Sequence, residues 1–141
     1  MRITTTGHYR DTTIDVKLVL SALWTGMLFV FAYVDIFGFY RADVLNAALS
    51  GEVGATGLAV DQLFLTGTVV YVLLPSVMAV ASLLLPPRVY RTANIVLACL
   101  CAATIVGTCV GEHWAYYLLG SLVEVVILAF VAHTAWTWPT T

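Results

Sequence analysis

The chain has 141 residues, of which 61% are hydrophobic and 10% are charged, and its formal net charge is -2 at pH 7. Soluble domains contain roughly 45–50% apolar and about 25% charged residues, so this composition excludes a soluble globular domain and a disordered chain. Six Lys and Arg residues are too few for the basic surface that nucleic-acid binding requires. We therefore expect an integral membrane protein whose first partner is the lipid bilayer.

Four apolar stretches are long enough to cross the hydrocarbon core of a bilayer, which takes about 20 helical residues. Helices are expected because lipid cannot satisfy the polar groups of an irregular backbone. The first stretch is longer than the 7–15 apolar residues of a signal peptide, so we expect it to be retained. The prediction is one all-α domain over residues 1–141, a membrane-embedded four-helix bundle with spans at about 18–40, 63–85, 92–111 and 114–138.

The connection between the first two spans is the longest one. Val44, Leu45, Ala48 and Leu49 fall on one helical face, which predicts a short amphipathic helix over Asp43–Ser50 on the outer membrane surface. Several glycines follow, so we expect a flexible return to the second span. An unstructured loop is the alternative.

Basic residues indicate the orientation of the bundle, because loops rich in Lys and Arg stay in the cytoplasm. Arg41 alone falls on the predicted outer side. A multi-pass protein of the cell membrane with both termini in the cytoplasm is therefore predicted. The basic residues on the inner side are Arg2, Arg10, Lys17, Arg88 and Arg91.

Glu124 is the sharpest single feature. It lies about 15 Å past the start of the fourth span, near the bilayer centre, where none of the spans places a Lys or Arg. We expect it to be neutral at pH 7 and to donate a hydrogen bond. Ionisable groups in the membrane are expensive and are candidates for function. The alternative is a structural carboxylic acid that bonds to a neighbouring helix.

Helical periodicity predicts a polar-lined pocket that opens outward above Glu124. Ordinary packing of small and hydroxyl side chains between helices is the alternative, and we favour it for the threonines but not for the two acids. The predicted ligand-binding residues are Asp35, Tyr71, Thr104, Thr108, His113, Tyr117 and Glu124.

The His and Cys residues do not predict a metal or redox site. His113 and His133 are about 30 Å apart on a continuous helix, too far to share one ion. Cys99, Cys101 and Cys109 contain no C-x-x-C pair, and we interpret them as small packing residues. We expect neither a metal nor a cofactor.

Short motifs spread over nearly the whole chain suggest a family. They are Leu20-Ser21-Ala22-Leu23-Trp24, Tyr33-x-Asp35, Arg91-x-Ala93-Asn94, Glu124 and Ala135-Trp136-x-Trp138. In these the chain resembles an uncharacterised bacterial family of small DoxX-like four-helix membrane proteins. The resemblance implies the four-helix bundle and marks Arg91 and Asn94 as structural polar positions, but implies no activity. DoxX proteins are tied loosely to redox and quinone metabolism, and this chain lacks the cysteine pair that a thiol mechanism needs.

Two functions of different class follow from these residues. The first is binding of a small lipophilic molecule such as a quinone or lipid, or an accessory role beside another membrane protein or in a homodimer. The second is a membrane-embedded enzyme with Glu124 as a tentative catalytic general acid, assisted by Tyr71, Tyr117 or Asp35. Transport is a weaker option, because four helices alone rarely enclose a path.

Overall fold

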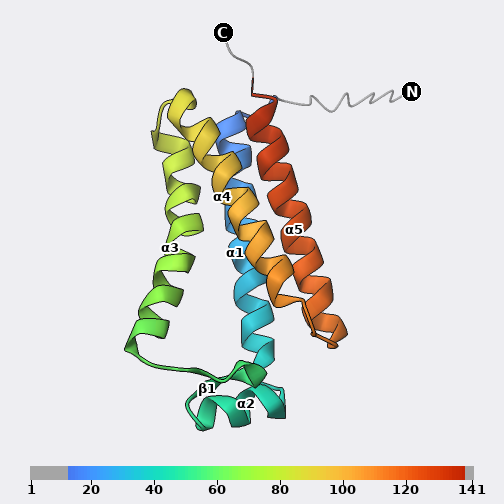
Figure 1. Ribbon diagram of the computed structural model, residues 1–141. Helices are drawn as coiled ribbons and strands as arrows, with labels where there is room; N and C mark the ends of the chain where they lie inside the picture. The colour runs from blue at the N-terminus through green and yellow to red at the C-terminus, as the bar shows by residue number, and fades with distance from the viewer. Residues whose placement is uncertain (1–12, 139–141) are drawn as a thin grey trace, which may run out of the picture.

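The computed structural model describes residues 13–138 and contains four long helices with a short segment between the first two (Figure 1). All four long helices have the length and composition to cross a membrane. Large apolar side chains are exposed along each of them, as expected of helices that face lipid. The long helices are α1 (Val16–Gly38), α3 (Gln62–Leu84), α4 (Pro87–Thr108) and α5 (Ala115–Trp136).

Helix boundaries agree with the predicted spans except at α4. The third span was predicted to begin at residue 92, but α4 begins at Pro87. A proline in the first turn needs no hydrogen-bond partner for its nitrogen and has a helical φ already, so the helix starts at once after Pro86. Arg88 and Arg91 consequently lie in the first turns of α4 and not in a loop.

The segment between α1 and α3 is more ordered than the sequence suggested. The predicted short helix is present as α2 (Ala42–Leu49). The return that we expected to be flexible is a two-stranded antiparallel hairpin of β1 (Glu52–Val53) and β2 (Leu58–Ala59), joined by the 3-10 turn η1 (Gly54–Thr56). Gly57 has a φ of 70°, which a side chain would strain, so the turn depends on glycine there. The side chain of Asp61 then accepts a hydrogen bond from the backbone N–H of Phe64 at 2.8 Å and starts α3.

The bundle is tightly packed at one end and open at the other. Helix α5 packs against α1 and α4, and α3 packs mainly against α1 and makes few contacts with α4 (Figure 1). We call the end where α1 starts and α5 ends the terminal end, and the opposite end the α2 end. Most buried side chains lie toward the terminal end, among them Leu20, Trp24, Tyr90, Leu128 and Val131.

Near the α2 end, α3 separates from its neighbours. From Gln62 to Val70 no residue of α3 is buried, and only Phe64 is half-buried. On the other side of the bundle α1 and α5 stay in close contact: a Cβ atom at Gly120 would clash with Val34. Space therefore opens between α3 and the other three helices in this half of the bundle.

Candidate ligand-binding site

A cavity of about 530 Å³ occupies the open half of the bundle. All four long helices line it, and most of the lining is apolar. Its volume lies within the roughly 300–1,000 Å³ that small-molecule sites have. We call it the central cavity. Besides the predicted pocket residues and Ser121, its lining consists of Phe31, Val34, Leu63, Phe64, Gly67, Thr68 and Ile105.

The carboxyl group of Glu124 lies at this cavity without a partner. Glu124 is only 2% exposed, and its Oε1 is buried without a hydrogen bond from any residue of the described part of the chain. Leaving a buried polar atom unpaired costs about 1–3 kcal/mol. Because Glu124 also lines the cavity, its carboxyl group has hydrogen-bonding capacity that no protein group uses.

The structure brings six of the seven predicted pocket residues to one cavity. Each spanning helix supplies at least one of them. The six are Asp35 from α1, Tyr71 from α3, Thr104 and Thr108 from α4, and Tyr117 and Glu124 from α5.

The seventh residue, His113, was placed wrongly. Helix α5 begins at Ala115, so His113 precedes the helix and does not share the face of Tyr117 and Glu124. It is exposed and lines a different cavity. Gly120 lies close to Val34 and does not line the central cavity.

Ser121 lies on the face of α5 that Tyr117 and Glu124 share, and it was not predicted. It is 4% exposed and lines the central cavity. Its spacing of four residues from Tyr117 and three from Glu124 was a signal in the sequence, but a serine in an apolar helix is equally typical of plain packing.

Hydroxyl groups in the central cavity are mostly committed to protein partners. Thr104 donates to the backbone carbonyl of Cys101 at 2.8 Å, so the 2.6 Å hydrogen bond between Tyr71 and Thr104 has the Tyr71 hydroxyl as its donor. Thr68 and Thr108 likewise donate to carbonyls of their own helices. These four hydroxyl groups can still accept hydrogen bonds from a ligand, but their protons are already used in hydrogen bonds to the protein.

A second cavity of about 560 Å³ lies at the α2 end, between α2, the hairpin and the α4–α5 connection. We call it the peripheral cavity. It shares four lining residues with the central cavity, which places the two next to each other. The shared residues are Val34, Asp35, Thr108 and Tyr117.

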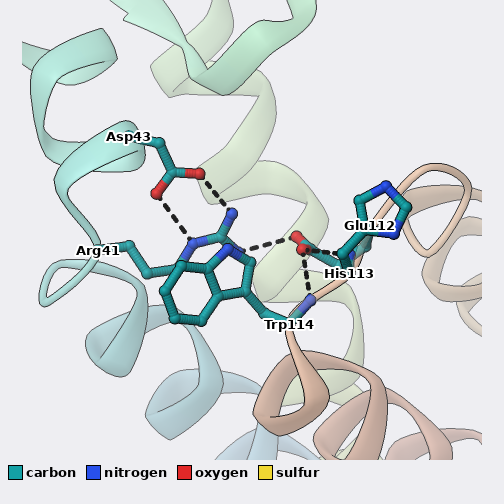
Figure 2. Close-up of polar contacts among 5 residues, drawn as sticks. All are labelled: Arg41, Asp43, Glu112, His113 and Trp114. Carbon is teal, nitrogen blue, oxygen red and sulfur yellow. Dashed lines mark hydrogen bonds and ion pairs between the residues drawn. The ribbon is translucent and has the colours of Figure 1, made fainter.

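Arg41 holds the segments around the peripheral cavity together (Figure 2). Its guanidinium donates two hydrogen bonds to Asp43, at 3.2 and 2.6 Å, and one to Glu112 at 2.9 Å. The indole ring of Trp114 stacks on it, 4.8 Å from the guanidinium carbon to the ring centroid. In Figure 2 the imidazole of His113 points away from this cluster. Asp35, which could have paired with Arg41, does not.

Electrostatics in this cluster keep all three groups ionised. The hydrogen bonds from Arg41 hold the pKa of Asp43 below its ordinary value, and Asp43 in turn raises the pKa of Arg41. Burial tends to raise the pKa of Glu112, but the bonds from Arg41 and from the backbone N–H groups of Trp114 and His113 outweigh it, so the pKa of Glu112 is lowered. The cluster is a permanent ion network at neutral pH.

Arg91 and Asn94 lie at the terminal end, away from both cavities. Asn94 is fully buried, accepts a hydrogen bond from the indole N–H of Trp24 at 2.6 Å and donates one to the carbonyl of Tyr90 at 2.8 Å. Arg91 donates to the carbonyl of Trp136 at 2.8 Å. These contacts join α1, α4 and α5 at the end where the bundle is densest.

Within residues 13–138 no three His, Cys, Asp or Glu side chains come together as metal ligands. His133 is exposed on α5. Among the three cysteines, only Cys101 is buried.

The chain belongs to a family of unknown function, DUF6326, whose model matches residues 11–141. No curated protein and no solved structure matches the chain. The family covers nearly the whole chain but assigns no activity, so the site itself must carry the functional argument.

Proposed function

We propose that this protein is an integral membrane protein that binds a small lipophilic molecule in the central cavity, with a polar group of that molecule against Glu124. The carboxyl group of Glu124, a residue that lines a cavity of ligand size and whose buried Oε1 has no protein partner, carries the proposal. A carboxyl group is too costly in a bilayer to be kept for packing alone when no neighbouring side chain bonds to it. The resemblance to DoxX-like proteins fits a membrane-soluble ligand and adds no reaction.

Orientation is part of the proposal. The distribution of basic residues supports an orientation with both termini in the cytoplasm. The peripheral cavity then lies on the outer side, and the central cavity opens outward through it, past Asp35, Thr108 and Tyr117.

A cavity-filling variant tests ligand binding without touching a polar group. Gly67 lines the central cavity, and a Cβ atom there meets no other atom within 4 Å, so Gly67→Phe fits the fold and occupies the space. Gly107 on α4 is equally free of neighbours but lines neither cavity, and Gly107→Phe is the matched control. The measurement is native mass spectrometry of protein purified from membranes.

We expect an adduct of defined mass on the wild type and on the control Gly107→Phe. The adduct should be lost in Gly67→Phe. An adduct pattern that is the same in all three proteins would contradict binding in the central cavity. The accessory-subunit function would then be the better one, with Glu124 as a contact to another chain.

A further inference from the structure

Charge complementarity at the central cavity points to one class of ligand. The cavity is lined by two carboxyl groups, Asp35 on α1 and Glu124 on α5, and its lining in the described residues includes no Lys, Arg or His. A buried charge is tolerated only when an opposite charge pairs with it. A cavity that can become negative and has no positive group of its own is therefore complementary to a cation.

The hydrogen-bonding groups at the cavity also favour a cation. The hydroxyls of Thr68, Thr104 and Thr108 donate to carbonyls of their own helices, and Tyr71 donates to Thr104. No side-chain amide, indole or imidazole N–H is among the lining groups of the described chain. The remaining donors of the wall are the hydroxyls of Ser121 and Tyr117 and the carboxyl groups when protonated. Acceptors therefore outnumber donors, which suits a ligand that donates hydrogen bonds or is positively charged.

Aromatic rings form much of the remaining wall. Phe31, Phe64, Tyr71 and Tyr117 come from three different helices. The rings of Phe31 and Tyr71 lie 6.2 Å apart between centroids and are tilted by 46°. Aromatic faces attract cations, and they do so most strongly where water is excluded.

The way in from the α2 end also favours a cation. The peripheral cavity is lined by three carboxyl groups, those of Asp35, Asp43 and Glu112, and by one guanidinium, that of Arg41. Arg41 is already bound to two of these acids. A passage with an excess of acidic groups raises the local concentration of cations and repels anions.

We infer that the ligand of the central cavity is a lipophilic cation, a hydrophobic amine or a quaternary onium ion, which takes the place of the acidic proton of Glu124. This inference rests on the proposed function and specifies its ligand class. When an onium ion binds, the O–H bond of Glu124 breaks, the proton leaves to solvent, and the carboxylate pairs with the cation. A hydrophobic amine that enters as the free base takes the same proton itself, and the ammonium–carboxylate pair forms without net change of charge.

Other titratable groups at the cavity are few. Asp35 from α1, Tyr71 from α3 and Tyr117 from α5 face the same space as Glu124, and α4 lines it with Thr104, Ile105 and Thr108, which do not titrate. Asp35 and Glu124 are thus the two groups whose protonation can compete with the cation.

Two probe ions of equal size and opposite charge make the test sharp. Binding of tetraphenylphosphonium and of tetraphenylborate to the purified protein in a neutral detergent is measured by equilibrium dialysis. We expect saturable binding of the phosphonium ion only, and a loss of at least about tenfold in affinity in Glu124→Gln. Glu52→Gln, which changes an exposed acid of the hairpin outside both cavities, is the matched control and keeps wild-type affinity.

Proton exchange gives an independent readout. Where Glu124 is protonated in the free protein, the affinity for the phosphonium ion should rise up to about tenfold per pH unit as pH rises, because one proton leaves for each cation bound. Calorimetry in buffers of different ionisation enthalpy counts that proton. Asp35→Asn shows whether the count belongs to Glu124, since the dependence on pH should survive in that variant and disappear in Glu124→Gln.

Failure of the inference is distinct from failure of the proposed function. Absence of phosphonium binding, equal binding of both ions, or wild-type affinity in a folded Glu124→Gln protein would overturn the cation inference. If a mass adduct is still lost in Gly67→Phe, the cavity binds a neutral or anionic lipophilic molecule and the proposed function stands. If that adduct is also missing, both fail.

Discussion

Arg41 and Glu112 are 71 residues apart in the chain, and their side chains form an ion pair of 2.9 Å at the α2 end of the bundle. Both side chains are largely shielded, with 11% and 16% of their surface exposed. The pair joins the segment that follows α1 to the α4–α5 connection, which no backbone hydrogen bond does.

Removing the charge of Glu112 should therefore destabilise the protein. Glu112→Gln keeps acceptors for the backbone N–H groups of His113 and Trp114 but loses the ion pair, and we expect a loss of about 1–3 kcal/mol. Thermal unfolding can be followed by thiol labelling of Cys101, which is buried, after Cys99 and Cys109 are changed to Ser. Glu52→Gln is the control, and an unchanged Tm for Glu112→Gln would contradict the role of the pair.

The two ion pairs of Arg41, with Asp43 and with Glu112, should make the stability of the protein depend on pH. The pKa values of Asp43 and Glu112 are lowered in the folded protein, so the unfolded chain binds more protons between the folded and the ordinary values. Their contribution is complete above about pH 4–5, the ordinary range for Asp and Glu, and is lost as pH falls through the lowered values. The difference in Tm between wild type and Glu112→Gln should shrink toward zero as pH falls through the lowered pKa of Glu112, and a difference that stays constant over this fall in pH would have another cause.

The hydrogen bond between Trp24 and Asn94 should be a main source of stability at the terminal end. Asn94→Leu leaves the indole N–H of Trp24 buried without an acceptor, which costs about 1–3 kcal/mol. The double variant Trp24→Phe, Asn94→Leu should recover part of this loss, since neither polar group then remains. Asn46→Ala, at an exposed position of α2, is the control. Additive losses in the double variant would exclude a direct coupling.

Contact between α1 and α5 depends on the absence of a side chain at Gly120. Gly120→Ala pushes a methyl group into Val34, and we expect a loss of about 1–3 kcal/mol. Val34→Ala in the same protein should restore most of it, whereas Gly107→Ala, with no atom near its Cβ position, should be close to neutral. If Val34→Ala gives no rescue, the two helices do not approach as described.

Orientation can be tested by labelling single cysteines in intact cells. In a protein otherwise free of cysteine, Glu52→Cys at an exposed position of the hairpin should react with a membrane-impermeant maleimide, and Thr140→Cys should react only after lysis. The reverse pattern would place the peripheral cavity in the cytoplasm.

Hydropathy and helical periodicity predicted the spanning helices better than they predicted the contacts at the site. The positions of the spans follow from hydropathy, and the importance of Glu124 follows from its depth along one helix. Both can be predicted because they depend only on residues that are close in sequence. His113 was lost from the predicted face because α5 begins at Ala115, and a residue that precedes the helix does not follow the helical periodicity. The Arg41–Glu112 pair and the hairpin depend on how the loops meet in space, which periodicity within single helices does not encode.

Because α3 makes little contact with α4, the width of the central cavity is separated from the stability of the bundle. The terminal half of α3 is packed, its α2-side half is not, and Pro75 lies between them without an N–H for the carbonyl of Tyr71. Tilting the free half changes the width of the central cavity and leaves the seams of α5 with α1 and α4 intact. Substitutions in the α2-side half of α3 can therefore change the size of the molecule that the cavity accepts, with little loss of thermal stability.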